Sequence, residues 1–402
     1  MNTNIERTEP RSGSIWEIFR VALRLGLTSF GGPVAHLGYF RAEYVERRQW
    51  LNDRAYAELV SLCQLLPGPA SSQVGIAIGM LRGGWLGGLA AWSGFTLPSA
   101  LALAALAFVL EETGSADGSW AKWLLLVAVA VVAQAVQGMA RTLAPERKTG
   151  TVALAAAVAS LLWPSAWMQL IVLSVAAIVG LLLFHRAGQA GDLSSPLPSP
   201  VSARAAVWLL GLFTLLLIGL PFAAAVMDNK WVQLADIFYR AGSLVFGGGH
   251  VVLPMLEPAM AEQAWMSGDR FMAGYGAAQA VPGPLFTISA YIGMAADGWL
   301  GALIALLAMF LPSFLLVGGA LPFWNAIRGQ ARLQAALTGV NAAVVGILLA
   351  ALYNPVFTGA VHNEFDLCVV LAAYALLVLW KVPAWLLAGA ALAAGIATTW
   401  WM

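Results

Sequence analysis

Two Pro-Gly-Pro tripeptides interrupt apolar segments of this 402-residue chain: Pro67, Gly68, Pro69 and Pro282, Gly283, Pro284. Proline removes a backbone donor and pushes the residue before it out of the helical region, so both segments must break there. A helix that restarts in an apolar environment presents unpaired N–H groups and a partial positive charge, which favour an anion. The two tripeptides therefore predict two anion-binding helix starts.

Polar side chains flank both breaks. Ser71 and Ser72 follow the first break and Thr287 follows the second, while Gln64 and Gln279 each lie three residues before a break. Hydroxyl and amide groups can donate hydrogen bonds to an oxyanion. The alternative is that the serines cap a helix and the glutamines join two helices.

Two arginines occupy matching places upstream of the breaks, Arg24 and Arg240, and Arg20 lies four residues before the first of them. Arginines arriving from opposite faces could neutralise a dianion and orient its oxygens with their planar forks. The alternative is that they extend to lipid headgroups.

A second set of candidate residues consists, in each half, of two glycines and a histidine that follows them. They are Gly31, Gly32 and His36, then Gly247, Gly248 and His250. Glycine permits turns closed to other residues, so we expect each pair to break a helix beside the site. Each histidine is interpreted either as a proton or anion contact or as a hydrogen-bonded core residue.

Composition identifies the environment of these groups. The chain is 60% hydrophobic and 10% charged, against roughly 25% charged in soluble domains. Apolar runs of about twenty residues predict an all-α polytopic membrane protein in contact with a lipid bilayer. The thirteen apolar segments are 15–40, 55–80, 84–110, 122–140, 150–163, 167–184, 205–226, 232–258, 271–296, 299–321, 333–353, 366–380 and 383–401.

The chain matches itself at a shift of 214 to 216 residues. Besides the tripeptides and the arginines, Trp50 meets Trp265, and Leu97-Pro98-Ser99 meets Leu311-Pro312-Ser313. This pattern predicts a tail (1–14), a first repeat (15–184), a cytoplasmic linker (185–204) and a second repeat (205–402).

The distribution of Lys and Arg orients the segments. Basic loops near Arg147, Arg204 and Arg332 should be cytoplasmic. The basic loop 41–54 is also cytoplasmic only if segments 15–40 and 55–80 enter the membrane and return to the same face. Their counterparts in the second half, 232–258 and 271–296, would then enter the membrane from the opposite face. We therefore expect two inverted repeats with nine spanning helices and four re-entrant hairpins, an inner amino terminus and an outer carboxyl terminus; thirteen spans are the alternative. Inverted repeats with broken helices are typical of secondary transporters.

The motifs Phe30-Gly-Gly-Pro33, Gln64-Leu-Leu-Pro-Gly-Pro-Ala-Ser-Ser-Gln-Val-Gly75, Phe246-Gly-Gly-Gly249 and Val281-Pro-Gly-Pro284 resemble the chromate ion transporter family. Their order and spacing are similar to the two-domain, long-chain type. The resemblance implies export of chromate across the bacterial inner membrane, chromate resistance, and sulfate as a chemically similar oxyanion.

Three other functions stay open: a sulfate or other oxyanion importer, an anion channel and an intramembrane enzyme. The enzyme is disfavoured, because the sequence has no nucleotide fingerprint, haem ligand pair or thiolate cluster. We expect no cofactor, no metal and no nucleic-acid partner. The oligomeric state stays open, with a homodimer as one option, and so does the source of energy.

Overall fold

The computed structural model describes residues 14–30, 32–113, 119–163, 166–184, 199–245, 252–327 and 330–401, and every regular element in these ranges is helical. The α-helices are α1 (Ile15–Thr28), α2 (Gly32–Phe40), α3 (Asp53–Leu65), α4 (Ala70–Thr113), α5 (Ser119–Leu143), α6 (Arg147–Leu162), α7 (Ala166–Leu183), α8 (Ala203–Val226), α9 (Lys230–Leu244), α10 (Leu253–Glu262), α11 (Gly268–Ala280), α12 (Ile288–Ala320), α13 (Trp324–Ile327), α14 (Ala331–Ala351), α15 (Thr358–Ala360), α16 (Glu364–Val378) and α17 (Ala384–Trp401). Four short π- or 3-10 helices join them: η1 (Arg41–Arg47), η4 (Leu285–Thr287), η5 (Leu321–Phe323) and η6 (Leu352–Phe357).

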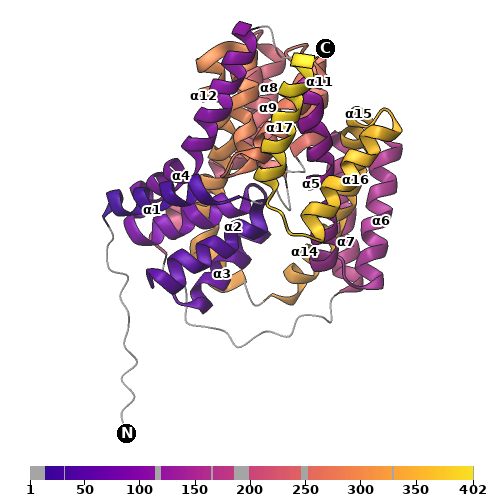
Figure 1. The fold of residues 1–402 in the computed structure, drawn as a ribbon. Helices are drawn as coiled ribbons and strands as arrows, with labels where there is room; N and C mark the ends of the chain where they lie inside the picture. Colours follow the sequence, from indigo (N-terminus) through magenta and orange to yellow (C-terminus); the bar gives the residue numbers. More distant parts are fainter. Residues whose placement is uncertain are drawn as a thin grey trace.

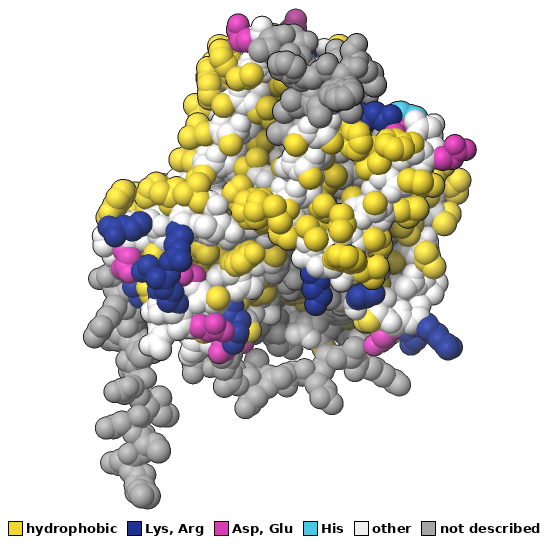
Figure 2. All heavy atoms as spheres, viewed as in Figure 1, with side chains coloured by type: hydrophobic (Ala, Val, Ile, Leu, Met, Phe, Trp, Pro, Cys, Tyr) yellow, Lys and Arg dark blue, Asp and Glu magenta, His cyan; other side chains and the backbone are white. Residues whose placement is uncertain are grey.

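Five helical stretches of the described chain are long and apolar enough to cross a membrane: Ala70–Glu112, Lys122–Arg141, Ala203–Val226, Leu285–Phe323 and Ala331–Ala360. Helix α8 packs against α9 and α12 on one side, but none of its most apolar window is fully buried by the rest of the protein. Hydrophobic side chains also cover much of the visible flank (Figure 2). An apolar surface of this kind needs lipid, so the expectation of an all-α polytopic membrane protein is confirmed.

The expected helix breaks are present at both tripeptides. Helix α3 ends at Leu65 and α4 begins at Ala70, while α11 ends at Ala280 and η4 begins at Leu285. The residue before each first proline is extended, with φ/ψ of −81°/142° at Leu66 and −93°/138° at Val281. This is the conformation that proline imposes on its predecessor.

The stretch 41–54 differs from the simple loop expected from its charge. Residues 41–47 form the π-helix η1, which continues directly from α2. Its wide turn places Glu43 against two arginines, with Oε2 3.1 Å from Arg47 Nη1 and Oε1 2.7 Å from Arg48 Nε. Internal ion pairs therefore hold part of the basic cluster in a helical conformation.

Two long helices are each bent into two limbs at a glycine. Gly84 in α4 has φ/ψ of 60°/−153° and Gly298 in α12 has 60°/−154°, a region closed to residues with a side chain. The limbs of α4 fold together so tightly that a methyl group on Gly79 would collide with the Gly87 carbonyl. Each bend lies where two predicted apolar segments meet.

Short helices pack along the second limbs of these bent helices through glycine. A Cβ on Gly26 of α1 would lie 2.7 Å from the carbonyl oxygen of Gly94 in α4. A Cβ on Gly242 of α9 would likewise collide with the Met309 carbonyl in α12. Small residues allow this close backbone approach between membrane helices. In Figure 1, α1, α2 and α3 lie at the lower end of the molecule, whereas α11 and the end of α17 lie at the upper end.

Candidate functional site

The two Pro-Gly-Pro breaks meet the ends of α1 and α9. The backbone N–H of Gly283 donates to the Ser29 carbonyl oxygen at 2.9 Å, and the N–H of Gly68 donates to the Val245 carbonyl oxygen at 2.6 Å. Ser29 directly follows α1, and Val245 directly follows α9. Each break in one half of the chain is therefore hydrogen-bonded to a broken helix in the other half. We call this meeting point the central crossing.

Glycine is required at both tripeptides by conformation and by space. Gly68 has φ of +113° and Gly283 has φ of +107°, in the region that strains residues with a side chain. A Cβ on Gly68 would lie 2.8 Å from Gln73 Nε2 and 3.3 Å from Ser313 Oγ, and one on Gly283 would lie 2.8 Å from Ser99 Oγ. The Leu-Pro-Ser motifs thus bring Ser99 and Ser313 to the breaks of the opposite halves.

Buried polar side chains occur on the helices that form the central crossing, both at their ends and within α2, α4 and α12. They are Ser29, His36, Ser71, Ser72, Gln73, Thr96, Ser99, Ser243, Thr287, Ser289 and Ser313. Burial of a polar group in an apolar interior is costly unless it finds a partner. So many together mark a polar centre inside a membrane protein.

Several of these side chains have a polar atom without a protein partner. The hydroxyls are those of Ser29, Ser72, Thr96, Ser243, Ser289 and Ser313, joined by His36 Nε2 and Gln73 Oε1. Because nearly all buried polar groups in proteins are hydrogen-bonded, such a group of exceptions needs an explanation. Hydroxyl groups with spare protons can donate to a bound anion.

Other members of the cluster are held by local hydrogen bonds. Thr287 Oγ1 donates to the Pro284 carbonyl at 2.7 Å, and Ser99 Oγ donates to the Thr96 carbonyl at 3.1 Å. Thr287 therefore stabilises its own turn and makes no capping hydrogen bond to α12. Gln73 Nε2 donates to the Pro67 carbonyl at 2.6 Å and fixes the first tripeptide.

His36 lies beside the central crossing and is fully buried. Its Nδ1 atom is 3.3 Å from Ser71 Oγ, and its ring meets the edge of Phe95 with 5.3 Å between centroids. The backbone of Phe95 in turn approaches Gly283, 3.4 Å from an ideal Cβ there. Two predicted site residues, His36 and Ser71, are thus brought together.

The two glutamines occupy different environments. Gln64 is exposed on α3. Gln279 is partly buried on α11 and hydrogen-bonded to Tyr275. Neither is among the fully buried groups at the central crossing.

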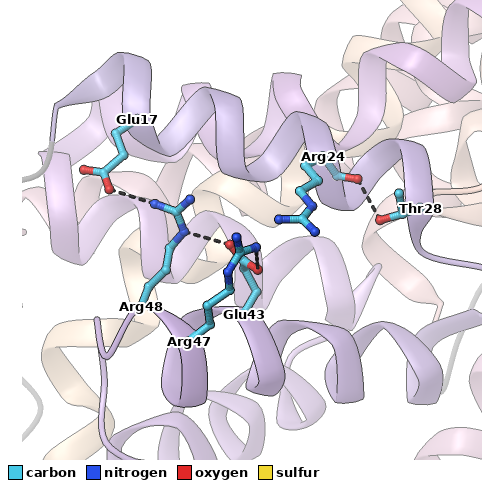
Figure 3. Close-up of polar contacts among 6 residues, drawn as sticks. All are labelled: Glu17, Arg24, Thr28, Glu43, Arg47 and Arg48. Atoms are coloured by element: carbon cyan, nitrogen blue, oxygen red, sulfur yellow. Dashed lines mark hydrogen bonds and ion pairs between the residues drawn. The ribbon is translucent and has the colours of Figure 1, made fainter.

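The two arginines also lie away from the buried cluster. Arg24 is exposed on α1, and its guanidinium extends toward η1, which carries Glu43 and Arg47 (Figure 3). Arg240 is held by Asp236 on its own helix, with Nε 2.8 Å from Oδ1 and Nη2 2.6 Å from Oδ2. The carboxylate therefore already satisfies the Arg240 fork.

Four predicted site residues lie outside the described residues: Gly31, Gly247, Gly248 and His250. Gly32 is described and has φ of +79°, with open space where a Cβ would be. No group of three or more metal-ligating side chains occurs within the described part of the chain.

Sequence reasoning missed Ser29, Gln73, Thr96, Ser99, Ser243, Ser289 and Ser313. A signal existed for two of them, because Ser99 and Ser313 belong to the recurring Leu-Pro-Ser motif. Thr96 and Ser243 have apolar counterparts in the other half, Phe310 and Leu27, so the repeat gave no indication of them.

Comparison with known proteins adds an independent finding. The sequence profile described as "Chromate transporter" matches residues 16–181 and 232–396. The chain is 29% identical over 341 residues to the chromate transport protein of Pseudomonas aeruginosa, an alignment covering 83% of this chain and 79% of that relative. It is 29% identical over 350 residues to the chromate transport protein of Cupriavidus metallidurans, covering 82% and 79%.

A probable chromate transport protein of Synechococcus elongatus is 28% identical over 352 residues, covering 84% of each chain. No solved structure matches this chain significantly. Helix α8 lies between the two regions that the profile matches.

Proposed function

The chain belongs to the chromate transporter family, and from this premise we propose that it is a secondary active transporter that exports chromate across a bacterial inner membrane and confers chromate resistance. Relatives that align over most of the chain are named chromate transport proteins. The observation that carries the proposed site is the pair of hydrogen bonds between opposite breaks, Gly68 to Val245 and Gly283 to Ser29, beside buried hydroxyls that lack protein partners.

Chromate is a tetrahedral dianion with four acceptor oxygens, and it loses its hydration shell inside a membrane protein. The site must therefore replace water with donors. The unpartnered hydroxyls of Ser72, Ser289 and Ser313 supply such donors on both sides of the central crossing. The helix starts at Ala70 and Leu285 add partial positive charge without a buried cation. His36 and Ser71 complete the proposed donor set.

The proposed architecture is two inverted repeats, residues 15–184 and 205–402, joined by the linker 185–204. Helices α1 and α3 have 14 and 13 residues and end at the central crossing, whereas a span needs about 20 residues. This supports re-entrant hairpins in place of thirteen full spans. The first repeat then has four complete crossings and returns to its starting face, and the part of the second repeat after α8 also has four. Helix α8, outside both family regions, supplies the ninth crossing, which starts the second repeat from the opposite face.

The proposed orientation places the amino terminus in the cytoplasm and the carboxyl terminus in the periplasm. It rests on the positive-inside rule applied to the loops near Arg147, Arg204 and Arg332. Whatever the orientation of the protein, an inside-negative potential favours export of an anion by about 2.3 kcal/mol per negative charge for each 100 mV.

Transport in membrane vesicles of known orientation tests the proposal. Inside-out vesicles containing the protein should accumulate labelled chromate against its gradient, and right-side-out vesicles should not. Uptake confined to right-side-out vesicles would show an importer. Flux that neither saturates nor opposes the gradient would show a channel. A hundredfold excess of sulfate in parallel reactions measures how far the site separates two dianions of similar shape.

A further inference from the structure

Helices α1 and α9 carry matching arginines but differ in the residue one turn before them. Arg24 matches Arg240, whereas Arg20 of α1 occupies the place that Asp236 holds in α9. Residues four apart lie on one face of a helix, so each arginine shares a face with this upstream residue. The first half thus places a cation where the second half places an anion.

In the second half this arrangement leaves Arg240 unavailable to bind an anion. Asp236 is buried, and its two carboxylate oxygens accept bidentate hydrogen bonds from Arg240 at 2.8 and 2.6 Å. A bidentate pair of this kind fills the donor fork and cancels the charge. A dianion approaching α9 therefore meets a neutral pair.

In the first half the arginine stays available. Arg20 lies over the Trp16 ring, 5.8 Å from its centroid, and offers Arg24 no counter-charge. The Arg24 guanidinium has no ion pair among the described residues, and the contact drawn for this residue in Figure 3 is from Thr28 to its backbone carbonyl. Exposed and unpaired, it keeps its full donor set.

Three basic residues of α2–η1 and the turn after it are already paired with acidic residues. Arg41 binds Glu46 and Asp53, Arg47 binds Glu43, and Arg48 joins Glu43 to Glu17. Figure 2 shows a mixed basic and acidic patch at the lower left, where α1, α2 and α3 lie in Figure 1. The acidic residues Glu17, Glu43, Glu46 and Asp53 are thus all engaged by Arg41, Arg47 and Arg48, and none of them pairs with Arg24.

We propose that Arg24 collects the oxyanion at the face of the protein formed by α1 and η1, and that the difference between Arg20 and Asp236 makes this the loading face. The inference rests on the proposed transport of an oxyanion and adds an electrostatic asymmetry between its two entrances. An exposed charge at an entrance acts chiefly on encounter and on salt dependence. Arg24 should therefore lower KM at its own face without setting the turnover rate.

The test introduces the acidic partner of the second half into the first half and removes it from the second. Arg20→Asp recreates the Asp236–Arg240 spacing beside Arg24, and Asp236→Asn releases Arg240. Chromate transport is measured from each face in inside-out and right-side-out vesicles, at low and high ionic strength. Arg24→Gln serves as the direct variant. Arg147→Asp is the matched control, because it reverses an exposed arginine at the start of α6, a helix that packs against α7 and α14.

We expect Arg20→Asp and Arg24→Gln each to raise KM at the α1 face by about tenfold, the size of one lost charge-assisted hydrogen bond. KM at the α9 face should stay within about twofold of the wild-type value. High ionic strength screens exposed charges, so it should reduce the difference in KM between these variants and the wild type at the α1 face. Asp236→Asn should lower KM at the α9 face, and Arg147→Asp should behave as wild type.

The inference is overturned if KM at the α1 face is unchanged in both Arg20→Asp and Arg24→Gln, in membranes where the wild type transports chromate. Equal effects at both faces overturn it as well. A wild-type chain that moves no chromate in either vesicle type refutes the proposed function instead, so the two failures are distinct. The two first-half variants decide the question even if Asp236→Asn fails to fold.

Discussion

Gly68 donates its backbone N–H to the carbonyl oxygen of Val245 at 2.6 Å, which ties a break in the first half of the chain to a break in the second. The bond from Gly283 to Ser29 repeats this relationship with the halves exchanged. A movement of one half relative to the other must change both bonds together. The central crossing is therefore the point at which the two halves are mechanically linked.

Replacement of Gly68 by alanine should abolish transport. The added Cβ would lie 2.8 Å from Gln73 Nε2, and the φ of +113° strains any residue with a side chain. We expect a loss of about 1–3 kcal/mol in stability together with a disrupted bond to Val245. Thermal unfolding in detergent and vesicle transport measure the two effects.

Gly211→Ala is the control for this change, since a Cβ on that glycine of α8 meets nothing within 4 Å. It should retain full transport. Wild-type transport by Gly68→Ala would show that the close approach at the central crossing is dispensable.

Ser313→Ala should weaken substrate binding without weakening the fold. The buried Ser313 hydroxyl has no protein partner, so its removal costs the folded state nothing, whereas a bound oxyanion loses a donor worth about 1 kcal/mol or more. We expect KM for chromate to rise about fivefold or more with an unchanged unfolding temperature.

Thr287→Val is the informative contrast. Its hydroxyl donates to the Pro284 carbonyl at 2.7 Å, so the loss should fall on stability, by about 1 kcal/mol. A lowered unfolding temperature for Ser313→Ala with unchanged KM would argue that its hydroxyl serves the fold and not the substrate.

Glu43→Gln should destabilise the face formed by α1 and η1. The Glu43 carboxylate is 10% exposed and accepts from Arg47 and Arg48, so neutralising it leaves two guanidinium groups without their shared partner. We expect a loss of about 1 kcal/mol, below that of a fully buried pair because Arg47 is more than half exposed. Unfolding at low and high salt measures it, and a salt-independent difference would contradict an electrostatic origin.

Cysteine labelling should place residue 52 and residue 147 on the same side of the membrane. Both Asn52 and Arg147 are exposed, and a re-entrant first hairpin returns the chain to its starting face before α3. Cys63 and Cys368 are first replaced by alanine so that each variant has one thiol. A membrane-impermeant maleimide should modify both sites in inside-out vesicles and neither in intact cells.

Asp228→Cys, an exposed position between α8 and α9, should show the opposite pattern. Modification of residue 52 from the outer face of intact cells would mean that the segment 15–40 crosses the membrane completely.

Local chemistry made the helix breaks predictable. Proline acts on its own residue and the one before it, so Leu66 and Val281 could be assigned as extended without knowledge of their neighbours. The bends at Gly84 and Gly298 likewise fall at the predicted segment boundaries. The pairing of Asp236 with Arg240 was also readable, because residues four apart on a helix are neighbours, and the sequence interpretation overlooked it.

The free donors were not predictable in this way. Thr287 and Ser313 are both buried hydroxyls after a break or a proline, yet one is satisfied by Pro284 and the other has no protein partner. The Thr287 bond is local, to a carbonyl three residues back, whereas the Ser313 hydroxyl lies beside Gly68 in the other half of the chain.

The sequence by itself determined that the chain lies in a membrane, that it contains two related halves and where its helices break, because composition, repetition and the effect of proline are properties of the chain over short distances. Only the tertiary structure decided that each break is hydrogen-bonded to the opposite half and which buried hydroxyls keep a proton to donate. These properties arise from contacts between residues about 180 to 250 positions apart, or from the absence of such contacts, and burial in an apolar interior makes each of them energetically important.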